Sequence, residues 1–456
     1  MIKALGMDNF KSWKELKPIR LGRVTLLFGE NSSGKSSIIQ MLLLIKQTAE
    51  SFDRAQPLHL GSAESLVELG LFDDIVYEHQ VVKNPLKLHL EWTPDNYEQL
   101  DEEMKLDVEF KYITDMIRVT KLQFEFLVDP HIKTVDPELI ENAKLTRSTK
   151  GGYELEIEGK KIEQLGVTRE LAPVKFYGFP SKATSMFPGL NTLSYSVDKL
   201  ASDIHYIGPL RQIAKREYAW SGSSPDGVGR SGENAIQAIL ANIIERRSWR
   251  KAEKEKTMSL SDSTGEWLKR MGLIDSFEIK NVGGRQYKAV VTVPGSLTKV
   301  NVADVGIGVS QVLPIVVLAY FVPEGSIIIL EQPELHLHPS VQAKLGEFFF
   351  EVSSERNIQF IVETHSEHLL TRLQRKVAER GPDDLTEKDV QLYFSKYSQG
   401  KSSIDNLKID DTGKITNWPT NFFGDTTSDR EAIMKAIIRK KKQLASSENK
   451  SNAERE

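Results

Sequence analysis

Eight residues near the N-terminus have the types and spacing of a phosphate-binding loop. The stretch Gly29-Glu-Asn-Ser-Ser-Gly-Lys-Ser36 fits the pattern G-x-x-x-x-G-K-[ST] at every fixed position. The glycines of such a loop let backbone N–H groups approach phosphate oxygens, and the following helix N-terminus adds partial positive charge. Lys35 would reach the β- and γ-phosphates, and the Ser36 hydroxyl would bind Mg²⁺. The nucleotide-binding residues expected here are Gly29, Asn31, Ser32, Ser33, Gly34, Lys35, Ser36 and Ser37.

A second candidate group lies far along the chain, at Glu331-Gln-Pro-Glu334. It follows an apolar run, Ile327–Leu330. Because such a run predicts a strand buried on both faces, Glu331 is the first polar side chain to leave its C-terminal end. Mg²⁺ prefers carboxylate and water ligands where a nucleotide already supplies phosphate oxygens. We therefore expect Ser36 and Glu331 to hold Mg²⁺ together.

The segments around both groups predict an α/β fold. The apolar run Val24–Phe28 predicts a strand before the loop, and Ser37–Ile45 predicts a helix after it. Residues 301–370 alternate helix-like and strand-like segments, which is typical of a parallel sheet covered by helices. From Pro85 onward, apolar and polar residues alternate between prolines, which predicts antiparallel strands.

Four ordered motifs resemble the soluble branch of ABC-type ATPases that includes the RecF, SMC and overcoming-lysogenization-defect (OLD) proteins. Besides the phosphate loop, Asn9-Phe-Lys-Ser12 resembles an N-terminal element that lies close to the nucleotide. Glu331–Pro339 resembles the second acidic motif, and Phe360–Ser366 resembles the strand that ends in a switch histidine, His365. The resemblance implies ATP and Mg²⁺ as cofactors and adds Lys11 to the ATP-binding residues.

The expected architecture is α/β: an ABC-type P-loop ATPase head with an inserted antiparallel β-rich lobe and flanking helices. We expect the ATPase core at 1–84 and 276–424, the inserted lobe at 85–180 and a helical segment at 181–275. Residues 425–456 are expected to form a C-terminal helix and a disordered tail.

The stretch Val305-Gly-Ile-Gly-Val-Ser-Gln311 stands where this superfamily has its signature motif, although it departs from the usual L-S-G-G-Q order. Gly308 allows close backbone approach, and Ser310 at a helix N-terminus can face a γ-phosphate. In the superfamily that phosphate belongs to the partner subunit. The resemblance thus implies a homodimer or higher oligomer in which Gly306, Gly308, Ser310 and Gln311 act across the interface. The alternative is an ordinary glycine-rich helix entry.

Gln332 departs from many relatives, which carry a second carboxylate at this position to polarise the attacking water. An amide cannot accept a proton, and loss of a general base costs about 10²–10⁴ in rate, so we expect slow hydrolysis. Glu334 could act as the base instead, or it could be an ordinary loop residue. His365 could sense the γ-phosphate or position water. The catalytic candidates are therefore Glu331, Gln332, Glu334 and His365.

Composition excludes several other classes of protein. The chain has 456 residues, a formal net charge of −4 and no cysteine, which rules out disulfides and thiolate metal sites. No apolar run approaches the roughly 18 residues of a membrane span, and the N-terminus has no export signal. We therefore expect a cytoplasmic protein without a membrane partner. Arg211 and the basic run Arg439–Lys442 could contact phosphates of nucleotide or DNA, with surface ion pairs as the alternative.

The C-terminal part of the chain indicates a particular branch of the superfamily. Trp418-Pro-Thr-Asn-Phe-Phe423 resembles an element of stand-alone bacterial ATPases of the OLD-like group, and too few residues follow His365 for a Toprim nuclease domain. Several such ATPases work with a separate nuclease. In Septu anti-phage systems, that nuclease is of the HNH type. The resemblance implies an ATPase or nucleotide sensor that controls a partner nuclease. The alternatives are a RecF- or OLD-like repair or recombination ATPase acting directly on DNA, and a scaffold with a vestigial site.

Overall fold

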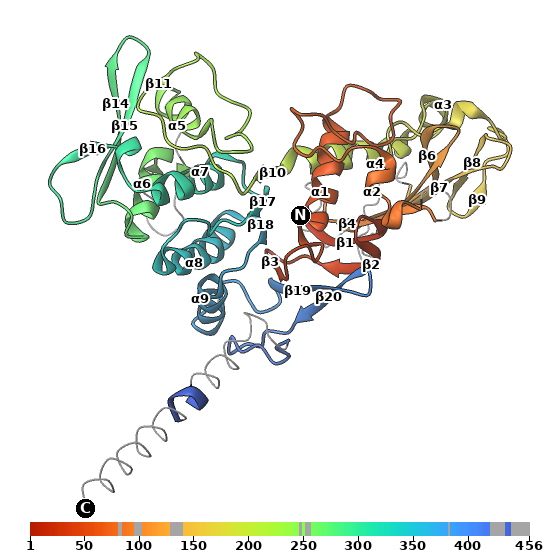
Figure 1. The fold of residues 1–456 in the computed structure, drawn as a ribbon. Helices are drawn as coiled ribbons and strands as arrows, with labels where there is room; N and C mark the ends of the chain where they lie inside the picture. The colour runs from red at the N-terminus through yellow and green to blue at the C-terminus, as the bar shows by residue number, and fades with distance from the viewer. Residues whose placement is uncertain are drawn as a thin grey trace, which may run out of the picture. The chain divides into compact units, whose positions relative to one another are not determined.

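A six-stranded sheet forms the centre of the fold, with the order β10-β17-β18-β3-β19-β20 (Figure 1). The computed structural model describes residues 1–80, 84–94, 103–127, 140–245, 249–250, 257–381, 384–419 and 434–438. The strands of this sheet are β3 (Val24–Gly29), β10 (Ile204–Ile207), β17 (Ile327–Glu331), β18 (Gln359–Glu363), β19 (Val390–Ser398) and β20 (Lys401–Leu407). Neighbouring strands are parallel except β19 and β20, which pair antiparallel.

Burial along these strands explains the parallel arrangement. β3 and β18 are buried at every residue, and β17 is buried at all but its last residue, Glu331. Parallel strands that are covered on both faces carry such continuous apolar runs. Because β3, β17 and β18 run in the same direction, the loop after Gly29 lies at the same edge of the sheet as Glu331 and Glu363. This is the edge at which open α/β sheets bind ligands.

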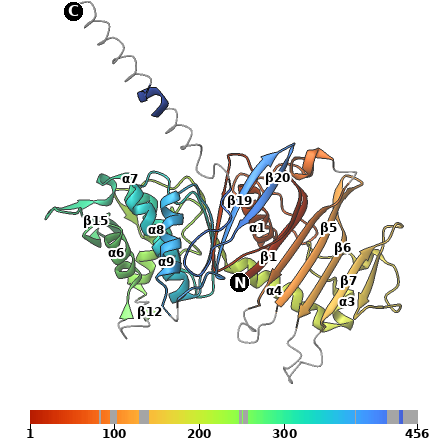
Figure 2. The same ribbon diagram turned by 90° about the horizontal axis from the view of Figure 1, so that it is seen from below.

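Helices pack on opposite sides of this sheet (Figure 2). α8 contacts β3 and β18 and packs beside α9, whereas α1 contacts β3 and packs beside α4. The helices are α1 (Lys35–Glu50), α2 (Phe72–Ile75), α3 (Ser181–Met186), α4 (Asn191–Asp203), α5 (Ala235–Ile244), α6 (Leu260–Arg270), α7 (Ile307–Phe321), α8 (Pro339–Arg356) and α9 (Glu367–Ala378), with 3₁₀ turns η1 (Tyr77–His79), η3 (Arg169–Leu171), η4 (Pro188–Leu190) and η5 (Val302–Asp304). α1 starts directly after the phosphate loop, so its N-terminus adjoins that loop.

A second sheet is antiparallel throughout and has eight strands in the order β2-β1-β4-β5-β6-β7-β8-β9. They are β1 (Ile2–Phe10), β2 (Trp13–Arg20), β4 (Leu86–Trp92), β5 (Glu103–Ile113), β6 (Met116–Leu127), β7 (Asn142–Arg147), β8 (Tyr153–Ile157) and β9 (Lys160–Lys161). Burial alternates along β4 and β5, so one face of the sheet packs on the core and the other is more exposed. The boundary expected at residue 85 falls inside this sheet, because β4 pairs with β1.

One buried amide joins the two sheets. Gln359, at the start of β18, accepts a hydrogen bond from the backbone N of Ile2 at 2.9 Å. Its Nε2 donates to the carbonyls of Ile2 at 2.7 Å and Gly22 at 2.9 Å. A buried side-chain amide with all these partners satisfied fixes the register between the strands it joins.

A smaller sheet lies in the same part of the chain as the helices α5, α6 and α7. It contains β11 (Tyr218–Ala219), β14 (Ser276–Gly283), β15 (Gln286–Thr292) and β16 (Lys299–Asn301), and β12 (Trp249–Arg250) pairs separately with β13 (Thr257–Met258). α7 packs against α5 and α6. The segment 181–275, expected to be helical, also supplies β10 to the central sheet. The α/β class with an antiparallel β-rich lobe and flanking helices is confirmed.

Residues Met1–Thr416 form one unit and Asn417–Glu456 a second. Within the second, residues 434–438 are helical and Trp418 is 46% exposed. The expected disordered tail, Phe422 and the run 439–442 lie outside the described residues.

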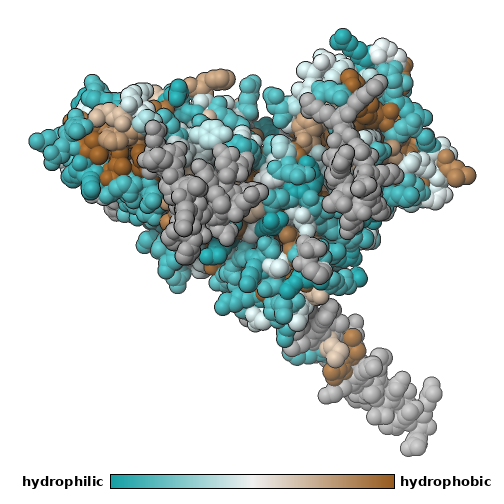
Figure 3. Space-filling view, turned by 180° about the vertical axis from the view of Figure 1, so that it is seen from behind, coloured by the Kyte–Doolittle hydropathy of each residue, from teal (hydrophilic) through white to brown (hydrophobic). Residues whose placement is uncertain are grey.

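Across the described ranges, no helix combines the length and apolar character required for a bilayer span. The face in Figure 3 is largely hydrophilic, with apolar side chains gathered in separate patches.

Candidate nucleotide-binding site

The two fixed glycines of the phosphate loop are required by its geometry. Gly29 has φ of 145°, and a Cβ there would lie 2.2 Å from the carbonyl oxygen of Ser395. Gly34 has φ of 92°, and a Cβ there would lie 2.7 Å from Nε1 of Trp13. Both conformations favour glycine, and both close approaches exclude any side chain. The backbone conformation and the close neighbours of the loop therefore require glycine at both positions.

Side chains from both sheets hold this loop. Trp13 of β2 donates from Nε1 to the carbonyl oxygen of Gly34 at 3.0 Å. Ser33 donates to the carbonyl oxygen of Glu30 at 2.7 Å, and its hydroxyl lies 2.5 Å from that of Ser395 on β19. At the tip of the loop Asn31 and Ser32 are exposed. Sequence analysis did not select Trp13 or Ser395, because only the tertiary structure brings them to the loop.

Lys35 is held against the loop that precedes it. Its Nζ donates to the carbonyl oxygens of Gly29 at 3.0 Å and Glu30 at 2.7 Å. Burial lowers the pKa of Lys35, and the nearby carboxylates of Glu363 and Glu30 oppose that shift. The ammonium thus lies against the loop that is expected to bind phosphate oxygens.

Ser36 contacts a carboxylate that sequence analysis missed. Its hydroxyl donates to Oε2 of Glu363 at 2.9 Å. Glu363 is the last residue of β18, is 5% exposed, and lies opposite Glu331 in the parallel register. Burial raises the pKa of Glu363, and the hydrogen bond from Ser36 opposes that rise. An available signal was the apolar run Phe360–Val362 followed by Glu, the pattern that had selected Glu331.

Glu331 lies at the end of β17, as expected, and is contacted from β10. Tyr206 donates its hydroxyl to Oε1 of Glu331 at 2.7 Å. Arg211 donates to the carbonyl oxygens of Glu331 at 2.9 Å and Gln332 at 3.2 Å. Burial raises the pKa of Glu331, which Tyr206 and Arg211 oppose, and burial lowers the pKa of Arg211 to about 10. Arg211 therefore binds the backbone of the acidic loop.

The acidic loop has an uncommon backbone at Gln332. Its φ is 44°, a left-handed value that costs a non-glycine residue of order 1–3 kcal/mol. The Gln332 N–H donates to the carbonyl oxygen of Glu363 at 2.8 Å, and its own carbonyl accepts from Arg211. These two bonds stabilise a conformation that the residue would otherwise avoid.

Glu334 joins this loop to the switch histidine. Its Oε1 accepts a hydrogen bond from the backbone N of His365 at 2.6 Å, and its side chain is 8% exposed. Burial raises the pKa of Glu334. Partial burial of the imidazole and the charge of Lys35 lower the pKa of His365, which lies at the sheet edge. A neutral imidazole is therefore favoured there.

Lys11 contacts the helix that follows the phosphate loop, and the signature segment lies at the start of α7. Lys11 donates from Nζ to Oε1 of Gln40 on α1 at 2.6 Å. Gly306 caps α7 and is exposed, and Gly308 is half-buried. Ser310 and Gln311 are buried within their own chain, at 7% and 3% exposure. The Ser310 hydroxyl accepts from the backbone N of Ala214 at 3.4 Å, so the exposed part of the signature is its glycine-containing start.

The donor atoms at this edge suit a hard cation together with phosphate. Ser36, Glu331 and Glu363 offer only oxygen, which Mg²⁺ prefers. In the ranges that the structure describes, no group of three or more His, Cys, Asp or Glu side chains could hold a metal ion by itself. A metal here would therefore need phosphate oxygens and water as further ligands, as in nucleotide sites.

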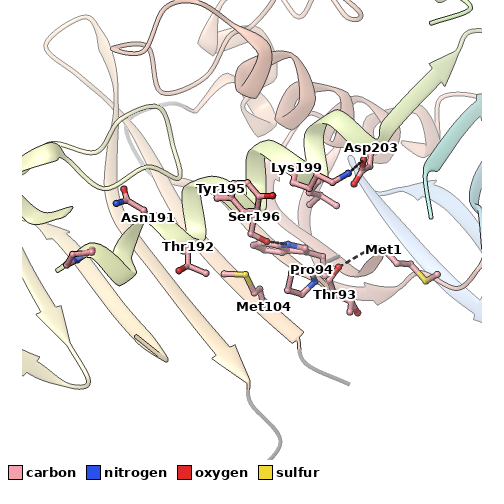
Figure 4. Close-up of a pocket in the computed structure, with 13 residues that line it drawn as sticks. Met1, Thr93, Pro94, Met104, Asn191, Thr192, Tyr195, Ser196, Lys199 and Asp203 are labelled. Carbon is pink, nitrogen blue, oxygen red and sulfur yellow. Dashed lines mark hydrogen bonds and ion pairs between the residues drawn. The ribbon is translucent and has the colours of Figure 1, made fainter. Parts of the chain in front are cut away.

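A cavity of about 390 Å³ lies apart from this edge (Figure 4). Trp92, Met104, Tyr195 and Lys199 line it, between α4 and the ends of β4 and β5. None of the predicted site residues lines it. Trp92 donates from Nε1 to the Ser196 hydroxyl at 2.8 Å, so part of its wall is a structural contact.

Comparison with family models supports the same class of protein. The model described as "AAA ATPase domain" matches residues 1–172. The model described as "AAA domain, putative AbiEii toxin, Type IV TA system" matches residues 203–371. With the geometry above, these matches support an ATPase with a P-loop fold. A third model, "Protein of unknown function (DUF3696)", matches residues 385–433.

Solved SMC heads cover most of the chain at low similarity. The SMC head domain from Thermotoga maritima is 13% identical, covering 90% of this chain and 99% of its own, with a TM-score of 0.41. An SMC head bound to the C-winged helix domain of ScpA is 13% identical, covering 90% and 98%, with a TM-score of 0.42. The Pyrococcus furiosus SMC head bound to the C-terminal domain of ScpA is 12% identical, covering 89% and 96%, with a TM-score of 0.44. No functional conclusion follows at this level, and no curated protein matches the chain.

Proposed function

We propose that the chain is an ATP-binding ABC-type ATPase or nucleotide sensor that controls a separate nuclease subunit in bacterial anti-phage defence. The observation that carries the nucleotide part is the convergence of the phosphate loop with two strand-end carboxylates. Lys35 lies at the loop, and Ser36 donates to Glu363, which is opposite Glu331 in the register. The binding of ATP with Mg²⁺ is the chemistry that this oxygen-rich, lysine-containing site suits best.

Each residue of this site would have a separate role. Lys35 and the loop N–H groups would bind the phosphates, while Ser36 and Glu331 would hold Mg²⁺, which neutralises phosphate charge. Gln332 cannot accept a proton, so turnover is slow unless Glu334 takes that role. Slow turnover keeps the ATP-bound form long-lived, which suits a sensor.

Control of a partner would follow from a shift between arrangements of the oligomer. Gly306 and Ile307 are exposed at the start of α7, where the phosphate of a second copy could be contacted. ATP would then favour the closed homodimer or higher oligomer, and the loss of ATP would let the subunits separate from this closed arrangement. A separate HNH-type nuclease in the cytoplasm is the favoured partner. The description of one matching model as a putative toxin of a type IV system supports a protein that works with a second component.

Phage challenge with a nucleotide-site variant tests the proposal. Cells would carry the gene with its native flanking genes, in wild-type form, as Lys35→Ala or as Lys150→Ala. Lys150 is exposed in the turn between β7 and β8 and serves as a lysine-to-alanine control. We expect Lys35→Ala alone to abolish protection and also to abolish the thermal stabilisation of the purified protein by Mg-ATP. Full protection by Lys35→Ala would contradict the proposal.

A second candidate function, direct action on DNA, is favoured by a basic groove. The groove, of about 800 Å³, lies between β2 and β20, and its lining includes Lys14, Lys17, Arg20 and Lys401 with a single carboxylate, Glu15. Such a charge balance suits a phosphodiester backbone. Tight binding of duplex DNA by the purified chain alone, falling steeply with salt, would favour this function over the first.

A further inference from the structure

Two glutamates end neighbouring strands of the central sheet, but they have different contacts. Glu331 and Glu363 are direct partners in the parallel register of β17 and β18. Oε1 of Glu331 accepts from the hydroxyl of Tyr206 at 2.7 Å, whereas Oε2 of Glu363 accepts from the hydroxyl of Ser36 at 2.9 Å. Of the two carboxylates, Glu363 is thus the one that contacts the expected metal-binding hydroxyl.

The backbone of Glu363 is also bonded to Gln332, the residue that stands where relatives carry a second carboxylate. The carbonyl oxygen of Glu363 accepts the backbone N–H of Gln332 at 2.8 Å, so the two residues are fixed side by side. The Glu363 side chain is 5% exposed, and the charge of Lys35 acts on it. A buried carboxylate beside a phosphate loop repels phosphate unless a cation lies between them, because a low-dielectric surrounding strengthens both interactions.

We propose that Glu363 is the second carboxylate of the nucleotide site and makes the site select the metal-bound form of the nucleotide. Glu363 holds the Ser36 hydroxyl at the loop, where that hydroxyl would be available as a ligand for a divalent cation. Its negative charge then favours nucleotide with a cation and disfavours nucleotide without one. Glu363 is a positioning residue that acts through Ser36, and the inference rests on the nucleotide site proposed above.

Removing the charge while keeping the hydrogen bond separates this role from a structural one. In Glu363→Gln, the amide oxygen still accepts from Ser36, so the packing of β18 is preserved. We expect metal-free ATP to bind about five-fold more tightly, because one buried repulsive charge is gone. Mg-ATP should bind more weakly than to wild type. The ratio of the metal-free to the Mg-bound dissociation constant should therefore fall by more than about five-fold.

The test is a titration of purified full-length protein with ATP by calorimetry, once in EDTA and once in excess Mg²⁺. Glu64→Gln is the matched control: it removes an exposed carboxylate outside the phosphate loop, and its ratio should stay within about two-fold of wild type. Glu363→Asp restores the charge and should restore most of the ratio. An unchanged ratio in Glu363→Gln, or an equal fall in Glu64→Gln, overturns the proposal.

Two further outcomes keep the inference distinct from the proposed function. If Glu363→Gln does not fold, Glu363→Met removes the same charge at a similar side-chain volume and should also lower the ratio; an unchanged ratio in Glu363→Met then overturns the inference. If wild-type protein binds ATP in neither buffer, the proposed function itself fails. Wild-type binding with an unaltered ratio in the variants refutes only the role of Glu363.

Discussion

Nε1 of Trp13 donates a hydrogen bond to the carbonyl oxygen of Gly34, 3.0 Å away and one residue before the phosphate-loop lysine. Trp13 begins β2 and is 1% exposed. The antiparallel sheet therefore holds the phosphate loop through a direct contact.

Trp13→Phe should weaken nucleotide binding as well as the fold. The ring stays but the donor is lost, which costs about 1 kcal/mol of unfolding free energy and loosens the loop. We expect Mg-ATP affinity to fall about five-fold, a loss of about 1 kcal/mol, measured by calorimetry. Trp92→Phe is the control, because it loses a comparable buried indole bond, to Ser196. Equal loss of affinity in both variants would refute a specific role for Trp13.

Gln332→Glu should raise the rate of ATP hydrolysis. The new carboxylate would stand where relatives place the base, and restoring a general base is worth about 10²–10⁴ in rate. Steady-state phosphate release measures the effect. Equal turnover in wild type and Gln332→Glu would shift attention to Glu334 as the base.

Gly306→Asp should impair nucleotide-dependent dimerisation without harming the monomer. No heavy atom lies within 4 Å of the position that a Cβ would occupy at Gly306, and aspartate is favoured at a helix N-cap. Its charge would repel a γ-phosphate presented by a second copy. Light scattering with Mg-ATP should show mainly monomer for the variant and dimer for wild type. A dimeric Gly306→Asp protein would contradict the proposed interface.

Glu331→Gln should stabilise the nucleotide-free protein at neutral pH. Burial raises the pKa of Glu331, so the folded state holds this proton more tightly than the unfolded state does. Stability from this group is therefore present below the unfolded pKa of about 4.3 and is lost as pH rises through the folded value. We expect Glu331→Gln to melt about 2 °C above wild type at pH 7.5, with the difference shrinking toward pH 4.5. Glu64→Gln, at an exposed site, should show no such trend.

The features that the sequence predicts best are those formed by residues that adjoin one another in the chain. The phosphate loop was predictable because a glycine pattern, a strand and a helix adjoin one another in sequence. The buried strand before Glu331 was predictable because a run that is apolar at every residue fits a parallel strand covered on both faces.

Other features depend on register and strand order, which local patterns do not encode. β3 lies between β18 and β19, although both follow it by most of the chain's length. Only that order brings Glu363 to Ser36. The boundary expected at residue 85 followed a change in the residue pattern along the sequence. In the structure, β1 and β4, which lie on either side of that boundary, are hydrogen-bonded neighbours. Arg211 was considered for phosphate, but its guanidinium binds carbonyl oxygens of the acidic loop.

The five residues of β18 carry Gln359 at one end and Glu363 at the other. The first is bonded to Ile2 in the antiparallel sheet, and the second to Ser36 at the phosphate loop. A strand this short and this completely buried is close-packed along its whole length. β18 therefore connects the phosphate loop with the first strand of the chain through one hydrogen-bonding side chain at each of its ends.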